Sequence, residues 1–250
     1  MLKKLIIISV LSVVSFAMTS LELAKKADEK TSNFKSSKSI MKMILTNAYG
    51  QKTIRDLNGK TLEGLDADKS LMEFLNPADV KGTKMLTHEY LNKDDNQWLY
   101  LPALKRIKRI ASSNKSGSFM GSEFSYEDIA NPNYKKFTYL DDLKIIKING
   151  VEYYQSTRVP KDKNSGYSKQ ITLIHKNTFL VYKIEYYDRK KELLKTAIFD
   201  KYRFIKGVYR IKSIKMINHQ NSKSTSLIWL KDDIKVNLNS KDFTKRKLKR

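Results

Sequence analysis

The sequence predicts a mainly β protein with few helices, built as a curved antiparallel sheet that forms a half-open barrel around an apolar cavity. After residue 40, short runs rich in Tyr, Ile, Phe, Val and Thr are separated by turn residues at intervals of about 8 to 14 positions. Nearly every run is joined to the next by a short turn, which favours antiparallel pairing. About a dozen strands in one sheet must curl, and a curled sheet of this size encloses more space than its own side chains fill.

The first 17 residues are expected to lie outside this domain. They contain two lysines, an apolar run of about ten residues, and small residues at Ser15 and Ala17. This is the arrangement of a secretory signal peptide, and the run is shorter than the roughly 20 residues that span a bilayer as a helix. We therefore predict export, cleavage after Ala17 and a single domain over residues 18–250. An uncleaved N-terminal anchor is the alternative.

The elements of the domain follow from periodicity and turn chemistry. One amphipathic helix is expected over residues 20–34, with Ser20 as its N-cap, and a short helix over residues 125–130. The dipeptides Asn58-Gly59, Asn149-Gly150 and Lys206-Gly207 suit the positive φ of tight hairpins. The expected strands cover residues 40–48, 52–57, 71–75, 83–91, 97–101, 106–110, 143–148, 151–158, 167–175, 180–187, 193–200, 208–219 and 223–230.

Composition limits the classes of function. The 250 residues carry 49 Lys plus Arg against 26 Asp plus Glu, a net charge of +23, and they include no Cys. Disulfides, cysteine nucleophiles, cysteine metal sites and an N-terminal lipid-modified Cys are excluded together. Forty of the basic residues are Lys, spread along the chain, and an exported protein meets little DNA, so we expect no nucleic-acid partner. Anionic membrane surfaces are the favoured electrostatic partner.

Catalytic and metal-binding patterns are not found in the sequence. His88, His175 and His219 are isolated and lack metal-ligand spacing. Glu123, Glu127 and Asp128 are candidates for an acid/base pair, but we expect nothing nearby to raise a pKa, and helix capping explains them. We therefore predict no catalytic residue, no metal and no cofactor, and an enzyme is the least favoured class.

Four segments resemble a known family. They are Asn76-Pro-Ala-Asp-Val-Lys-Gly-Thr83, the run over residues 98–110, the run over residues 119–129, and the ending over residues 242–248. Together they look like the LolA-like outer membrane lipoprotein-sorting proteins of the bacterial periplasm, in the branch associated with RND-type exporters. The family usually carries Asp at the position of Glu123, a mild chemical departure.

The resemblance implies a LolA/LolB-like curved sheet around an apolar cavity, covered by an N-terminal helix and by lid helices or loops. It also implies a periplasmic carrier of acylated lipoproteins or lipids, with an inner-membrane exporter and an outer-membrane acceptor as partners. A non-transporting lipid-binding or sensor module of an envelope complex is the alternative function, because a fold does not fix a function.

Strand alternation and the family motifs select candidate cargo-binding residues. Along residues 97–101, alternation places Trp98 and Tyr100 on one face and Leu99 and Leu101 on the other, without showing which face lines the cavity. Ordinary core packing is the alternative for each position. The full expected set is Trp98, Tyr100, Leu101, Phe119, Met120, Phe124 and Tyr126.

Three further segments carry predictions. Residues 112–126 combine small polar residues with a few large apolar ones, and we predict a mobile loop that gates entry. A basic run consists of Lys105, Arg106, Lys108 and Arg109. We expect it to dock the exporter or anionic lipid headgroups, with a solvated strand face as the alternative.

The basic tail over residues 241–250 is either a solvated end or a membrane contact.

Overall fold

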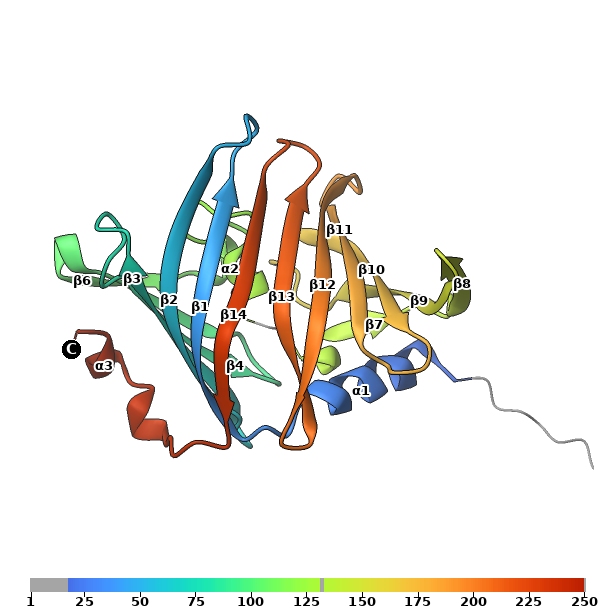
Figure 1. Ribbon diagram of the computed structural model, residues 1–250, viewed down its shortest axis with the longest axis horizontal. Coiled ribbons are helices and arrows are strands. Elements are labelled where there is room, and N and C mark those ends of the chain that lie inside the picture. Colours follow the sequence, from blue (N-terminus) through green and yellow to red (C-terminus); the bar gives the residue numbers. More distant parts are fainter. Residues whose placement is uncertain (1–17, 131–132, 250) are drawn as a thin grey trace, which may run out of the picture.

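The computed structural model describes residues 18–130 and 133–249, so the signal peptide expected over residues 1–17 lies outside the described residues. The described chain forms fourteen strands in one antiparallel sheet (Figure 1). The strands are β1 Ser36–Thr46, β2 Lys52–Leu62, β3 Ala67–Asn76, β4 Lys84–Tyr90, β5 Asn96–Leu101, β6 Arg106–Ile110, β7 Phe137–Tyr139, β8 Lys144–Ile148, β9 Val151–Pro160, β10 Tyr167–His175, β11 Val181–Asp188, β12 Leu193–Ile205, β13 Val208–Asn218 and β14 Ser224–Ile234. The helices are α1 Ser20–Thr31, α2 Tyr126–Ile129 and α3 Lys245–Leu248, with short 3₁₀ turns at Pro102–Leu104, Ser112–Asn114, Tyr134–Lys136 and Ser240–Asp242.

The two ends of the chain meet at the centre of the sheet. The strand order is β6-β5-β4-β3-β2-β1-β14-β13-β12-β11-β10-β9-β7, and β8 pairs with β9 beside this path. The first and last strands therefore pair with each other, and Met43 lies opposite Leu227. Two meanders run outward from this central pair, one ending at β6 and the other at β7. Antiparallel neighbours need only tight connections, which accounts for the short turns in the sequence.

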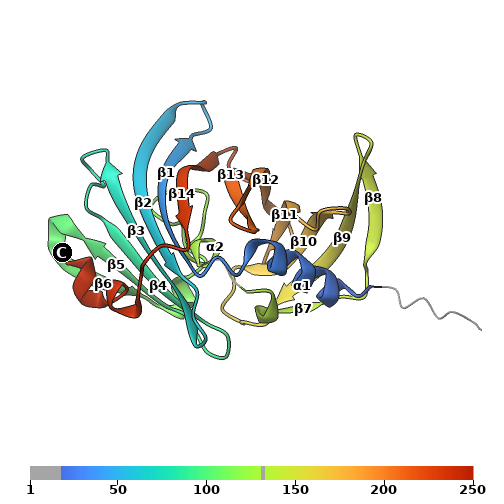
Figure 2. The same ribbon diagram turned by 60° about the horizontal axis from the view of Figure 1, so that its bottom comes forward.

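The sheet is strongly curved and does not close, so it forms a half-open barrel (Figure 2). This confirms the predicted fold class. Because side chains alternate along each strand, they project in turn to the concave inner face and to the convex outer face of the curved sheet. The largest hydrophobic cluster lies on the concave face and draws on both meanders, including Leu57 and Met85 from the first and Ala197 and Met216 from the second.

Helix α1 crosses one end of the concave side (Figure 2). Thr19 is its N-cap, one residue before the expected Ser20, and it forms a capping box with Glu22. Leu23 and Ala27 are buried against Ile174 of β10, so the apolar side of the helix faces the sheet. No helix within residues 18–130 and 133–249 is long and apolar enough to cross a membrane.

Two of the three predicted glycine turns are hairpins. Asn149-Gly150 joins β8 to β9 and Lys206-Gly207 joins β12 to β13, each with positive φ at both residues. The turn predicted at Asn58-Gly59 is wrong, because both residues lie inside β2. A Cβ on Gly59 would lie 2.5 Å from Ser39 Oγ and 2.7 Å from Met41 Cε, so this glycine makes room for side chains of β1.

Candidate functional site

The concave face of the sheet bounds a cavity of about 1270 Å³, which α1 and the connection between β6 and β7 also line. Its volume exceeds the roughly 300–1,000 Å³ of most small-molecule sites. Four of its apolar lining residues are Met, whose unbranched thioether side chains adapt to irregular shapes. A flexible apolar ligand therefore suits this wall. Its main apolar residues are Met41, Met72, Met85, Ile184, Phe199, Ile214, Met216, Leu227 and Trp229.

The connection that leaves β6 lies on the concave side, and we call residues 111–130 the crossing segment. Phe119 is fully buried in the concave core and Phe124 is 4% exposed. The segment ends in α2, whose N-cap is Ser125. The Ser125 hydroxyl accepts from the N–H of Asp128, and the Asp128 carboxylate accepts from the N–H of Ser125. This confirms the capping role expected for Asp128.

Side chains of the sheet hold the crossing segment in place. Arg55 Nη1 donates to the carbonyl of Met120 at 2.6 Å, and the N–H of Glu123 donates to Thr225 Oγ1 at 3.0 Å. The large apolar side chains of the segment are inserted into the core instead of resting at the cavity mouth. Residues 112–126, predicted to form a mobile gate, are packed against the concave core, and Phe124 is the large apolar side chain of this region that lines the cavity. The gating role stays a prediction.

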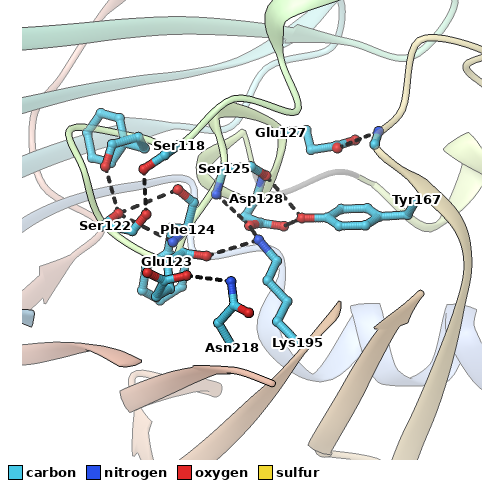
Figure 3. A network of polar contacts seen from close by, with 12 residues as sticks. Ser118, Ser122, Glu123, Phe124, Ser125, Glu127, Asp128, Tyr167, Lys195 and Asn218 are labelled. Carbon is cyan, nitrogen blue, oxygen red and sulfur yellow. Dashed lines mark hydrogen bonds and ion pairs between the residues drawn. The ribbon is translucent and has the colours of Figure 1, made fainter. Parts of the chain in front are cut away.

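A buried polar network joins the crossing segment to the second meander (Figure 3). Lys195 Nζ of β12 lies 2.6 Å from Asp128 Oδ2 and donates to the carbonyl of Glu123 at 3.0 Å. Tyr167 of β10 donates its hydroxyl proton to Asp128 Oδ1 at 2.8 Å, and Asn218 Nδ2 of β13 donates to Glu123 Oε2 at 2.7 Å. The side chains of the Lys195–Asp128 pair are each 5% exposed, so the charges neutralise each other away from solvent.

Glu127 is the second buried carboxylate of the crossing segment. It accepts from Ser165 Oγ and from the N–H of Gly166, both at 2.8 Å. Burial raises the pKa of Glu127. The expectation that nothing near this group raises its pKa is therefore wrong, because the desolvation comes from residues distant in sequence. Its hydrogen bonds fix the crossing segment to the loop before β10.

The interior tyrosines stay protonated. Burial, followed by the negative charge of Asp128, raises the pKa of Tyr167 and of Tyr186. Lys195 Nζ lies 5.3 Å and 5.6 Å from the two ring centroids. The network therefore acts as a neutral, hydrogen-bonded support beside the apolar wall.

Several carboxylates line the part of the cavity nearest α1 and β4. Burial raises the pKa of Asp28, of Glu63 and of Asp68. Burial raises the pKa of Glu89 to about 8, even though Lys136 Nζ lies 3.2 Å from its Oε1. This part of the cavity is polar, in contrast to the wall built by β1 and β12–β14.

The structure places the predicted cargo residues in three environments. Phe124 lines the cavity. Leu101, Phe119, Met120 and Tyr126 pack in the concave core or against it, but they are not part of the cavity lining. These four residues support the wall from behind.

Trp98 and Tyr100, predicted to bind cargo, lie on the convex face and do not line the cavity. Alternation along β5 sends them outward, where they pack with Leu86, Phe243 and Leu248. The sequence correctly separated the two faces of this strand, and the structure shows that Leu101 belongs to the inner one.

The C-terminal tail supplies the cover for this outer cluster. Phe243 is 1% exposed and Leu248 is fully buried. His88 Nε2 donates to the carbonyl of Phe243 at 2.9 Å, and Lys245 Nζ lies 4.9 Å from the centroid of a Trp98 ring. The tail is therefore packed against the sheet (Figure 2). Its basic residues between positions 241 and 249 are exposed.

The predicted docking residues are all exposed and lie at one edge of the sheet. Arg106, Lys108 and Arg109 are on β6, and Lys105 precedes it. Arg109 Nη2 donates to Asn96 Oδ1 at 2.8 Å. Exposed basic side chains on an edge strand also discourage pairing with other chains.

The structure adds cavity residues that the sequence analysis did not select. Met41 of β1, Met216 of β13 and Trp229 of β14 line the cavity. Period-two alternation marks these positions, since Met41 and Met43 are both buried two residues apart. The described residues contain no group of three or more His, Asp or Glu side chains that could hold a metal ion.

The class of protein is a mainly β half-barrel with an interior cavity, and comparison with known proteins identifies the family. A family model described as an uncharacterized protein family matches residues 66–250. A solved structure described as an outer membrane lipoprotein-sorting protein domain, from Vibrio parahaemolyticus, is 42% identical with a TM-score of 0.87, and the match covers 92% of this chain and 98% of that one. The chain therefore belongs to the family of outer membrane lipoprotein-sorting proteins.

Two other solved structures agree. A DUF1329 family protein from Desulfovibrio piger is 30% identical with a TM-score of 0.85, covering 91% of this chain and 97% of that one. A LolA superfamily protein from Nitrosomonas europaea is 20% identical with a TM-score of 0.76, covering 92% and 100%, and supports the fold. No curated protein matches the sequence.

Proposed function

We propose that the protein is a periplasmic carrier, not an enzyme, that binds acyl chains of lipoproteins or lipids in the concave cavity and shuttles them toward the outer membrane. The observation that carries this proposal is the apolar wall of a cavity of about 1270 Å³. Relatives described as outer membrane lipoprotein-sorting and LolA superfamily proteins support it. The signal-peptide pattern at the N-terminus supports a periplasmic location.

Acyl-chain binding follows from the chemistry of the wall. Each methylene moved from water to an apolar site contributes about 0.8 kcal/mol, so a chain of ordinary length binds without a catalytic or charged group. The methionines Met41, Met72, Met85 and Met216 allow chains of different length and unsaturation to pack on the same surface.

The two tryptophans provide an internal test of where cargo binds. Trp229 lines the cavity, whereas Trp98 lies under the tail on the convex face. A fatty acid brominated near the middle of its chain quenches tryptophan fluorescence only at short range. We expect it to quench Trp98→Phe, which retains Trp229, and to leave Trp229→Phe, which retains Trp98, almost unchanged. Unbrominated fatty acid of the same length is the control. Equal quenching of both variants, or of neither, would contradict binding in the cavity.

The partners are part of the same proposal. The exposed basic residues of β6 dock the carrier on an RND-type exporter or on anionic headgroups, because guanidinium groups bind phosphate and carboxylate bidentately. Replacing both arginines, Arg106→Glu with Arg109→Glu, is expected to abolish cargo loading while the melting temperature stays within a few degrees. Normal loading of this double variant would exclude the docking role.

A further inference from the structure

One row of concave side chains in the second meander is polar along its whole length. Directly opposed residues of antiparallel neighbours project from the same face, so cross-strand register defines the row. Two cations, Arg158 and Lys195, belong to it. In register order across β7 and β9–β13 the row is Tyr139, Arg158, Gln170, Tyr186, Lys195 and Asn218.

The two cations of the row differ in whether a carboxylate neutralises their charge. Lys195 is paired with Asp128 at 2.6 Å. Arg158 donates from Nε to Gln170 Oε1 at 2.8 Å, and its guanidinium carbon lies 4.1 Å from the centroid of Phe137. Among residues 18–130 and 133–249, no carboxylate oxygen lies within 4.0 Å of a nitrogen of Arg158. The guanidinium also hydrogen-bonds the side chain of Tyr139, its neighbour in the row. Of its five N–H donors, those not directed at Gln170 or Tyr139 are available to an anion.

The surroundings of Arg158 are a built polar wall inside the cavity. Arg158 and Gln170 both line the cavity, together with Ser156 and Thr172 from the adjacent row. Gln170 is 3% exposed and Thr172 is 4% exposed. Thr172 Oγ1 is buried and has no hydrogen-bond partner within the described part of the chain. Ile184, directly opposite Thr172 on β11, begins the apolar wall.

A cation in a partly desolvated site is costly unless an anion faces it. The planar fork of an arginine matches the oxygens of a carboxylate or a phosphate. We propose that Arg158, with Gln170 and Thr172, forms an oxyanion subsite that holds the carboxylate or phosphate head of an amphiphile whose chain lies on the apolar wall. This inference rests on the proposed function, because it requires the cavity to hold an acyl chain.

The subsite narrows the class of cargo. A fatty acid or an anionic lipid offers both an acyl chain and an oxyanion, whereas the acylated N-terminus of a lipoprotein carries no charge at its lipid group. An anionic lipid therefore fits the cavity better than a lipoprotein.

The test compares amphiphiles with one chain length and different heads. Laurate, dodecyl phosphate and dodecanol are titrated below their critical micelle concentrations into residues 18–250 carrying Trp98→Phe, and Trp229 fluorescence reports binding. We expect the charged ligands to bind about tenfold more tightly than dodecanol, the effect of one charge-assisted hydrogen bond. In the added Arg158→Gln variant this preference should fall to within about twofold, while the affinity for dodecanol is retained.

Three controls make the result decisive. Lys212→Gln removes one positive charge from an exposed position on β13 and should preserve the preference. Arg158→Lys keeps the charge without the fork and should keep part of the preference, which also covers the case in which Arg158→Gln does not fold. Inorganic phosphate alone should not compete at equal concentration, because the chain contributes most of the binding free energy.

The outcomes separate this inference from the proposed function. Equal binding of all three ligands, or a preference that survives Arg158→Gln, overturns the subsite and leaves the carrier function standing. Failure to bind any of the three ligands overturns both. Full competition by inorganic phosphate would show a site for a free anion and would also overturn the headgroup proposal.

Discussion

Lys195 is the residue on which the interior polar contacts converge. It reaches Asp128 and the carbonyl of Glu123, and it lies beside the rings of Tyr167 and Tyr186. Sequence position gives no hint of this role, since Lys195 lies among forty lysines, most of which are exposed. The sequence indicates its partner, Asp128, only as a helix-capping residue. A buried ion pair between residues 67 positions apart is a property of the sheet register, which a single sequence does not reveal.

Removing the cation of this pair should be costly. Lys195→Met leaves the Asp128 charge buried with the hydroxyl of Tyr167 as a remaining donor, and we expect a loss of about 3–5 kcal/mol in the free energy of unfolding. Urea denaturation measures it. The matched control is Lys231→Met, which breaks the exposed pair with Asp233 and should cost under about 1 kcal/mol. Similar small losses in both variants would show that the interior pair does not hold the crossing segment.

Glu89 predicts a pH dependence of stability. It is 8% exposed, accepts from the N–H of Asn133 and lies 3.2 Å from Lys136 Nζ, yet burial raises its pKa from 4.5 to about 8. Because the folded state binds the proton more tightly than the unfolded state, this stabilisation is full below about pH 4.5 and is lost as the pH rises to about 8.

The experiment is a series of melting temperatures between pH 4.5 and pH 9. The wild type should lose stability across this range, and Glu89→Gln, which stays neutral, should show a flatter profile. Glu192→Gln at an exposed turn should follow the wild-type profile. If Glu89→Gln keeps the full wild-type slope, the ion pair with Lys136 keeps Glu89 charged in the folded protein.

At the scale of elements, the tail and the crossing segment are more buried than their composition indicates. Both are polar or basic and were expected to be mobile or solvated, yet each inserts a few large apolar side chains into a cluster, Phe243 and Leu248 outside and Phe119 and Phe124 inside. Their spacing lacks the period of a helix or a strand, so periodicity cannot show that they are buried. The three-residue strand β7 was missed for the same reason.

The regular strands were predictable because alternation and turn residues are local signals. Residues 106–110 and 167–175 match β6 and β10 at both ends. The turn predicted at Asn58-Gly59 is wrong because the glycine makes room for Met41 on the neighbouring strand and is not part of a turn. The candidate site shows the same limit, since alternation separated the faces of β5 but only the docked tail shows that Trp98 is outside.

The tail should contribute to stability through its apolar side chains and not through its charges. Phe243→Ala should lower the free energy of unfolding by about 3–5 kcal/mol, because it opens a cavity over Trp98 and Leu86. Replacing Lys245, Arg246 and Lys247 by Gln should change it little and should weaken binding to anionic vesicles if the tail touches membranes. This triple variant is a better test of membrane contact than truncation at Ser240, which would uncover the outer cluster. Equal stability of Phe243→Ala and wild type would contradict the packing.

On the scale of the whole molecule, the pairing of β1 with β14 joins the two meanders into one unit. The concave core contains side chains from both, and the crossing segment connects them a second time through Arg55 on β2 and Thr225 on β14. The sequence predicted thirteen of the fourteen strands and their rhythm, but it contains no local signal that the first strand pairs with the last. That pairing decides which side chains share the cavity, so the fold class was predictable and the cavity wall was not.

A shared core predicts cooperative unfolding even though two-state behaviour is usual only for domains under about 150 residues. Trp98→Phe reports on the centre of the sheet through Trp229, and Trp229→Phe reports on β5 through Trp98. Each substitution changes stability, so the fluorescence midpoint in urea is compared with the circular dichroism midpoint of the same variant. The two midpoints should coincide in each variant. If β3–β6 were an independent unit, Trp98 would report a separate transition. Coincidence would mean that ligand binding on the concave wall stabilises the outer strands and the docked tail as well, because one core connects them.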